Sequence, residues 1–434
     1  MSTNSRFIAA ACAGALALSL AACGAKDEAP PLAEGELGGK CTILQYETNT
    51  TAQYKGWELA LEKFKKEYPD LEVEWSTTSF DAIRTNAKIL LTGNDVPDVM
   101  QFNTGNADGG QLAAQGLLTP ITDLVDSNGW DKQIEGSVAA LARYDEEGRA
   151  GAGDWYGVPN TASFFTFYYN KEMFEKQGIT ALPETFTELE AVFESFLADG
   201  VTPVSSNAGE HAVLQTWWQL ISGVADREQI DNFILLKGPV DTSNGAFIEG
   251  TKTLERWLEK GYLGEQLAGI KGDEMERAFI AGEFPIMANG TWSFSRVYDE
   301  APFEWGTFTF PEAKLNAGAS GHLWGIPTNA KNKACGEAWI AMTLDPEVQN
   351  LIGAEGGIPV AGDTAMIEDD QMRLLNEQFD AIKGADALSF YPDYPVPGLL
   401  DLQMSELQKL TNGSTDSTAF MQALQKFYDE GSSF

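Results

Sequence analysis

From residue 42 onward, short apolar strands alternate with amphipathic helices, and this alternation leaves few folds open to the chain. Strand patterns occupy residues 42–46, 71–75 and 97–102. Between the first two, apolar residues over 57–68 recur at helical spacing, and Pro69 ends that helix. Strands joined by helices through short loops predict an α/β protein with a mostly parallel sheet covered on both faces.

Polar side chains follow two of these strands. Ligands of such sheets bind beyond the carboxyl ends of the strands. Tyr46 and Glu47 come at the end of the first strand, and Asn103 follows the third. All three can hydrogen-bond a hydroxyl group, so we expect them at a ligand site.

The first 22 residues have the pattern of a secretory signal. Arg6 precedes an apolar run over 7–20 that is too short to remain as a membrane-spanning helix. Cys23 directly follows Leu20-Ala21-Ala22, which resembles the lipobox of bacterial lipoproteins. There Cys23 would carry the lipid and become the new N-terminus, and two or more acyl chains give stable anchoring. The alternative is an ordinary secreted protein cut near Ala22.

Residues 23–40 are rich in Gly, Pro, Ala and charge, without apolar periodicity. They predict a flexible tether with a reach of roughly 20–25 Å. The folded body therefore begins near Cys41. It is too long for one ordinary domain and suits two or three.

The chain is strongly acidic. It has 64 Asp and Glu against 29 Lys and Arg, which gives a formal charge of −35. Such a field repels phosphate backbones, so we expect no nucleic-acid partner. It also disfavours anionic ligands and tolerates neutral or cationic ones.

Four cysteines divide into two groups. Cys12 leaves with the signal, and Cys23 is the lipidation site. Cys41 and Cys335 remain in the folded body. Outside the cytoplasm such a pair is often oxidised, so we expect a possible Cys41–Cys335 disulfide, with two separate buried thiols as the alternative.

Enzyme motifs are missing from the sequence. It contains no G-x-S-x-G, its one Gly-Lys step is followed by Cys41, and it has only two histidines, His211 and His322. The stretch 241–245 resembles a calcium loop, but Lys252 falls where a bidentate Glu is required. We therefore expect no catalytic residue, no metal and no cofactor. A secreted glycosidase stays a remote alternative, since paired carboxylates cannot be excluded among so many acids.

An ordered set of short motifs resembles the extracellular solute-binding proteins of ABC sugar importers, the maltose-binding-protein-like family. The resemblance covers nearly all of the chain after the signal. The motifs are Gly93-Asn94-Asp95-Val96-Pro97-Asp98-Val99, Gly116-Leu117-Leu118-Thr119-Pro120-Ile121, Tyr156-Gly157-Val158-Pro159, Tyr168-Tyr169-Asn170-Lys171, the stretch from Ala281 to Trp292, Trp324-Gly325-Ile326-Pro327 and Gly356-Gly357-Ile358-Pro359-Val360.

This resemblance implies a two-lobe clamp in which each lobe holds a mostly parallel sheet flanked by helices. Lobe one would comprise 41–158 and 312–354, and lobe two 159–311 and 355–434, with three hinge crossings. Such proteins close around an oligosaccharide and deliver it to the permease subunits of an ABC transporter. The implied molecule is a monomer, held by its lipid on the extracellular face of the cytoplasmic membrane of a Gram-positive bacterium.

A sugar site needs flat aromatic faces and hydrogen-bonding partners for hydroxyl groups. The family resemblance places Trp292 at the cleft as a stacking residue, with His322 and Trp324 at a crossover. Trp217 and Trp218 are adjacent and cannot share one helix face, so we expect one in the core and the other at the cleft. The sequence leaves open which of the two faces the cleft, and Trp218 is carried as the candidate. Further candidates are the strand-end residue Asn160 and Asp393, which lies on a rigid loop between prolines.

The ligand class stays open between two alternatives. One is a neutral oligosaccharide, although Glu47 and the polar stretch 103–106 differ from the charged lining of maltose-binding protein and put maltodextrins in doubt. The other is a different neutral or cationic solute, such as a peptide or a polyamine, which the acidic composition permits. Ionic strength would separate the two alternatives, because only the affinity for a charged ligand should fall steeply as the salt concentration rises.

Overall fold

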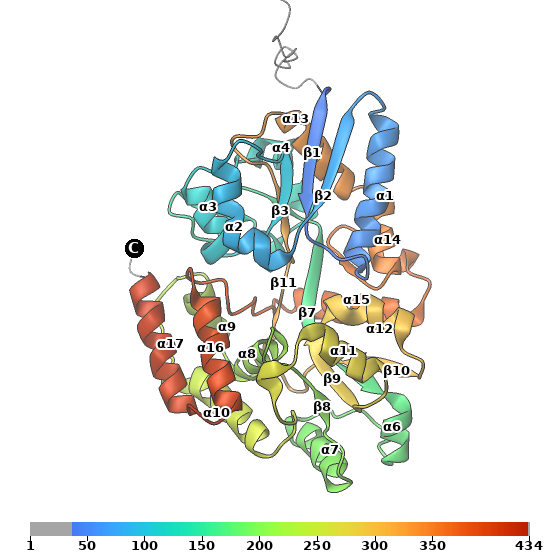
Figure 1. The fold of residues 1–434 in the computed structure, drawn as a ribbon, viewed down its shortest axis with the longest axis vertical. Helices are drawn as coiled ribbons and strands as arrows, with labels where there is room; N and C mark the ends of the chain where they lie inside the picture. Colours follow the sequence, from blue (N-terminus) through green and yellow to red (C-terminus); the bar gives the residue numbers. More distant parts are fainter. Residues whose placement is uncertain (1–36, 433–434) are drawn as a thin grey trace, which may run out of the picture.

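A computed structural model describes residues 37–432, which form two lobes stacked along the long axis (Figure 1). In this part of the chain, lobe one is built on a sheet with the order β2-β1-β3-β12-β6. Its strands are β1 (Lys40–Gln45), β2 (Glu72–Thr77), β3 (Val99–Phe102), β6 (Val158–Pro159) and β12 (Leu323–Gly325), with a separate pair β4 (Arg143–Tyr144) and β5 (Asp154–Trp155). Its helices are α1 (Ala52–Glu67), α2 (Phe80–Thr92), α3 (Gln111–Ala114), α4 (Thr122–Asn128), α5 (Gly136–Ala140), α13 (Lys333–Thr343) and α14 (Pro346–Ala354), with the turns η1 (Asn106–Gly110) and η2 (Trp130–Lys132).

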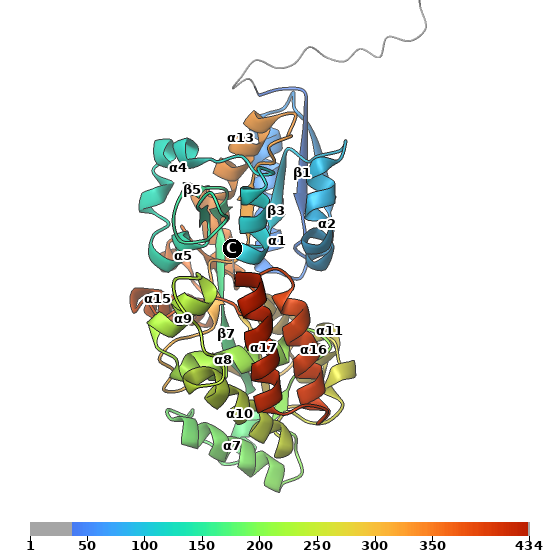
Figure 2. The ribbon, with the colours of Figure 1, turned by 90° about the vertical axis from the view of Figure 1, so that its left-hand side faces the viewer.

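Lobe two is built around the long strand β7, which leads from the junction into the lobe (Figures 1 and 2). Its strands are β7 (Thr161–Asn170), β8 (Val204–Ser205), β9 (Ile286–Gly290), β10 (Trp305–Phe308), β11 (Gly318–Ala319) and β13 (Ile358–Pro359). Its helices are α6 (Lys171–Lys176), α7 (Phe186–Ala198), α8 (Ala212–Val224), α9 (Arg227–Ile234), α10 (Gly245–Glu259), α11 (Gly272–Ile280), α12 (Phe294–Glu300), α15 (Asp370–Gly384), α16 (Leu399–Thr411) and α17 (Ser417–Ser432), with the turns η3 (Leu267–Gly269), η4 (Thr291–Ser293) and η5 (Thr364–Met366).

Strand directions correct the prediction of a mostly parallel sheet in each lobe. In lobe one β1 is parallel to β2 and β3, but β12 is antiparallel to both β3 and β6. In lobe two β7 is antiparallel to β9, β10, β11 and β13, and β8 is parallel to β9. Both sheets are mixed because crossing strands enter and leave each lobe through one junction and so run in opposite directions.

Local sequence explains how helix α1 forms and where it packs. Thr51 caps its N-terminus by accepting a hydrogen bond from the amide of Tyr54, 3.2 Å away. Trp57, Ala60 and Phe64 lie on its buried face. The helix therefore covers lobe one and directs its N-terminus, with residues 46–51, toward the junction.

Within residues 37–432, the chain crosses between the sheets three times. The first crossing joins β6 to β7, and the second runs from β11 at 318–319 to β12. The third leads from α14, which packs on α1, to β13 on β7. The second crossing thus comes after residue 319, whereas the sequence predicts the lobe boundary at 312.

A disulfide joins Cys41 on β1 to Cys335 on α13, with their Cα atoms 5.8 Å apart. Both cysteines are buried, so the bond ties the first strand of lobe one to a helix that returns much later in the chain. The predicted signal (1–22), its lipidation site Cys23 and nearly all of the tether lie outside the described residues. None of the helices within 37–432 has the length and apolarity that crossing a bilayer requires.

Candidate functional site

A cavity of about 670 Å³, called the cleft below, lies between the two lobes. Lobe one contributes the loop before α1 and the start of α2. Lobe two contributes the start of α8, the faces of α11 and α12, and the loop 391–394. Six of the residues predicted from the sequence line it: Tyr46, Glu47, Asn103, Trp292, His322 and Asp393.

Three other predicted site residues lie in the core, which corrects their assignment. Trp324 is fully buried and packs edge-on against Trp57 and Trp339 at 5.7 and 5.4 Å. Asn160 is buried as well, and its amide donates to the hydroxyl of Thr343. Strand β12 lies between β3 and β6, and Trp324 faces α1 and α13 from it. Asn160 lies in the connection between β6 and β7, where α13 covers it through Thr343.

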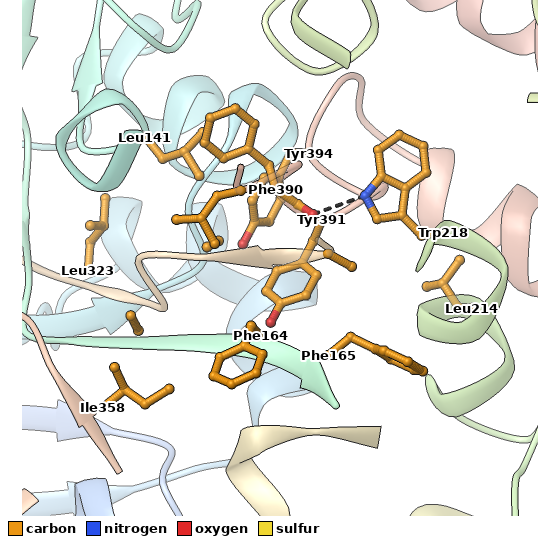
Figure 3. Packing of buried hydrophobic residues seen from close by; sticks show 14 of the residues in the cluster. Leu141, Phe164, Phe165, Leu214, Trp218, Leu323, Ile358, Phe390, Tyr391 and Tyr394 are labelled. Carbon is orange, nitrogen blue, oxygen red and sulfur yellow. Dashed lines mark hydrogen bonds between the residues drawn. The ribbon is translucent and has the colours of Figure 1, made fainter. Parts of the chain in front are cut away.

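Trp218 is the third correction. Its indole nitrogen donates to the carbonyl oxygen of Phe390 at 3.0 Å (Figure 3). Its ring packs on Phe233. Trp217 is also fully buried and donates to Thr251 at 2.8 Å. Neither indole faces the cleft, because α8 is enclosed by α10, α16, β7 and β9 and has no open face at this turn.

One group of rings lies at the lobe-one side of the cleft. The ring of His322 packs against Tyr46 at 4.7 Å and against Phe80 at 5.1 Å, and Phe80 also approaches His211 of lobe two at 6.5 Å. The hydroxyl of Tyr46 is buried and has no hydrogen-bond partner among the described residues. Burial raises the pKa of Tyr46, so this hydroxyl is a neutral group.

A second group of rings lines lobe two. Trp292 meets Tyr391 edge-on at 6.2 Å, and Tyr391 meets Tyr394 at 5.9 Å. The turn that carries Trp292 is held by the neighbouring Ser293, which donates to Glu276 at 2.5 Å. Arg296 in turn contacts Glu276 at 2.8 Å. The ring of Trp292 is therefore presented by an anchored turn and stays partly exposed to the cleft.

A charged cluster adjoins the cleft at Asn103 and Asp393. The guanidinium of Arg84 lies 2.8 Å from Asp108 and 3.3 Å from Asp393. The amide of Asn103 donates to both carboxylates. Burial alone would lower the pKa of Arg84, but Asp393 and Asp108 outweigh it and raise the pKa, so Arg84 stays charged.

Sequence comparison decides the family. Residues 47–350 match the family described as bacterial extracellular solute-binding protein. The chain belongs to this family. A probable sugar-binding periplasmic protein of Brucella suis biovar 1 (strain 1330) is 23% identical over 294 residues, which are 64% of this chain and 63% of that protein. The chain thus matches less than two thirds of the length of that relative.

Solved structures share the fold of this solute-binding protein. A chitin oligosaccharide binding protein has a TM-score of 0.77 at 21% identity, and covers 92% of this chain and 100% of its own. The protein described as SBP RafE in complex with raffinose has a TM-score of 0.69 at 19% identity. The match covers 90% of this chain and 99% of that protein. These likenesses confirm the predicted two-lobe α/β fold.

Two carboxylates that have no Lys or Arg partner within residues 37–432 also line the cleft of this solute-binding protein. Glu47 accepts a hydrogen bond from Thr51 at 3.4 Å and lies 3.7 Å from Nδ1 of His322. Glu210 accepts from the backbone amide of Gly272 at 2.8 Å. Among residues 37–432, no Lys or Arg forms an ion pair with either carboxylate. Both are therefore acceptors for ligand hydroxyl or amino groups.

Sequence reasoning missed Phe80 and His211. Phe80 follows β2, and His211 follows β8, so both come after the carboxyl ends of strands in a parallel pair. The rule that located Tyr46 and Asn103 would have found Phe80 had it been applied to the second strand. Strand β8 is only two residues long, too short to be recognised from its sequence. Residues 37–432 also bring no three His, Cys, Asp or Glu side chains into a group that could hold a metal ion.

Proposed function

We propose that this solute-binding protein captures a neutral oligosaccharide of two to four units between its lobes and delivers it to the permease of an ABC importer. The observation that carries the proposal is that aromatic faces and hydrogen-bonding side chains line one cleft together. Trp292 and Phe80 offer ring faces to the C–H side of a sugar. The carboxylates of Glu47 and Asp393 can accept hydrogen bonds from its hydroxyl groups, and the side-chain amide of Asn103 can donate or accept one.

The size of the cleft and the known relatives support a sugar ligand. A volume of about 670 Å³ suits a ligand larger than one small metabolite. One relative is described as a sugar-binding periplasmic protein, and the two structural neighbours as a chitin oligosaccharide binding protein and a raffinose complex. The protein would act without chemistry of its own, as a monomer. Its lipid on Cys23 would hold it at the outer face of the cytoplasmic membrane of a Gram-positive bacterium.

A cationic solute, such as a polyamine or a peptide, is the second candidate. The lack of a Lys or Arg partner for Glu47 and Glu210 within the described residues favours it, because each could pair with an ammonium group. A polyamine would bind more weakly as ionic strength rises, whereas a neutral sugar would not.

A thermal-shift screen of residues 37–434 against carbohydrate and polyamine libraries tests the proposal. A sugar present at a hundred times its dissociation constant should stabilise the fold by about 2.7 kcal/mol. Stabilisation by amino compounds alone would overturn the sugar assignment. Turnover of any carbohydrate by the purified protein would overturn the assignment as a binding protein.

A further inference from the structure

The loop that carries Asp393 is anchored in lobe two. The indole of Trp218 donates to the carbonyl oxygen of Phe390, which precedes the loop (Figure 3). The amide of Gln403 on α16 donates to the carbonyl oxygen of Pro392 at 2.8 Å. Trp218 and Gln403 are fully buried, so the loop moves with lobe two.

The carboxylate of Asp393 nevertheless reaches lobe one. Arg84 on α2 contacts its Oδ2 at 3.3 Å, and Asn103 after β3 donates to the same oxygen at 3.4 Å. The next residue, Tyr394, accepts a hydrogen bond through its carbonyl oxygen from the amide of Ala107 at 2.9 Å. The side chains of Arg84 and Asp393 are only 13% and 11% exposed, so this contact between lobes is shielded from water.

Arg84 also has a partner in its own lobe. Its Nη2 lies 2.8 Å from Oδ2 of Asp108, closer than Asp393. Two buried carboxylates thus share one guanidinium. Both lobe-one contacts of Asp393 go to Oδ2. Within the described residues, its Oδ1 receives no hydrogen bond and is available to the cleft that Asp393 lines.

We propose that Arg84 is a positioning residue: it holds Asp393 across the cleft through Oδ2 and thereby presents Oδ1 to a hydroxyl group of the bound sugar. This proposal rests on the proposed function of the cleft. When the lobes approach, Arg84 gives up part of its contact with Asp108 and gains the contact with Asp393. Lobe closure and ligand recognition therefore use the same ion pair, Arg84–Asp393. Asp108 competes with Asp393 for Arg84 and favours the open molecule.

Asp393→Asn and Asp108→Asn remove the same charge from the two partners of Arg84, and the proposal predicts different effects of these two variants on sugar binding. Arg84→Met and Asp393→Asn should each weaken sugar binding about tenfold or more, measured by calorimetry with the sugar identified in the screen. Asp108→Asn should keep the affinity of the wild type or tighten it, because Arg84 is then left to Asp393. Arg84→Lys, which keeps the positive charge but not the guanidinium group, should recover part of the loss.

Two further measurements separate this role from folding and from the proposed function. The denaturation midpoint of each variant reports folding, and small-angle scattering of the free protein should give a larger radius of gyration for Arg84→Met than for the wild type. An unchanged affinity in Arg84→Met, or an equal loss in Asp108→Asn and Arg84→Met, would overturn the proposal. A wild type that binds no sugar would refute the proposed function. In that case the scattering of Arg84→Met would still test the contact between the lobes. A radius of gyration equal to that of the wild type would refute this contact.

Discussion

Trp292 and Asp393 reach the cleft from the same lobe but supply different interactions. The ring of Trp292 offers an apolar face beside Tyr391, whereas Asp393 offers a carboxylate oxygen fixed by Arg84. A sugar that used both would have its C–H face covered and a hydroxyl bound. Under the proposed function, these two residues would contribute to affinity in different ways, Trp292 through contact area and Asp393 through a directed hydrogen bond.

Truncating the stacking residue should weaken sugar binding without unfolding the protein. We expect Trp292→Ala to lose at least tenfold in affinity, about 1.4 kcal/mol, at both low and high salt. Titration calorimetry measures this loss. Tyr298→Ala is the control, because Tyr298 is an exposed aromatic residue that does not line the cleft. An affinity loss that disappears at high salt would instead indicate a charged ligand.

Trp324 should behave in the opposite way. Because it is packed between Trp57 and Trp339, Trp324→Ala should lower the free energy of unfolding by about 3–5 kcal/mol. The affinity of the molecules that remain folded should stay near that of the wild type. Urea unfolding and calorimetry together check this, and a stable variant that has lost its affinity would contradict the core assignment.

Sequence patterns could predict which loops reach the cleft but not which rings are exposed there. Tyr46, Glu47 and Asn103 follow strand ends, a property visible in the sequence. Whether Trp218 and Trp324 are buried depends on helices that pack over them from distant parts of the chain. The partnership of Arg84 with Asp393 joins residues far apart in the sequence, and no local pattern signals it.

At the scale of elements, the start of helix α14 combines a cap with an ion pair. The carboxylate of Asp345 accepts a hydrogen bond from the amide of Glu347 at 2.9 Å and pairs with Lys63 of α1 at 2.7 Å. Burial would raise the pKa of Asp345, but Lys63 and the amide outweigh it and lower the pKa. This carboxylate therefore couples the helix end to α1.

Asp345→Ala should destabilise the protein by about 1–2 kcal/mol at neutral pH. A lowered pKa in the folded state means that the contribution is present above the ordinary value of 3.8 and is lost as the pH falls below it. Urea unfolding at several pH values should show the gap from the wild type closing in acid. Asp345→Asn is the matched control, because it keeps the cap and loses only the charge. A gap that stays constant down to low pH would refute the role of the carboxylate.

The elements that sequence periodicity predicts well are the early strands of lobe one. Residues 42–46, 71–75 and 97–102 overlap the observed β1, β2 and β3, whose pairing is parallel as predicted. Strand direction in lobe two could not be predicted, because it follows from the path of β7 through the junction. Periodicity identifies a strand, but its neighbours in the sheet are set by the connections.

At the scale of the whole molecule, the Cys41–Cys335 bond closes a loop that contains all of lobe two's residues between 161 and 319. Replacing both cysteines by alanine should cost about 2–4 kcal/mol in the free energy of unfolding. The folded variant should still bind sugar, because neither cysteine lines the cleft. Free thiols in the mass spectrum of the native, unreduced protein would contradict the bond.

Hydrogen–deuterium exchange with and without a saturating sugar tests the central claim most directly, namely that one ligand is held by both lobes at once. The account predicts slower exchange in peptides that cover 46–51 in lobe one, and 289–293 and 391–394 in lobe two. Protection confined to one lobe, or found away from these three segments, would contradict it.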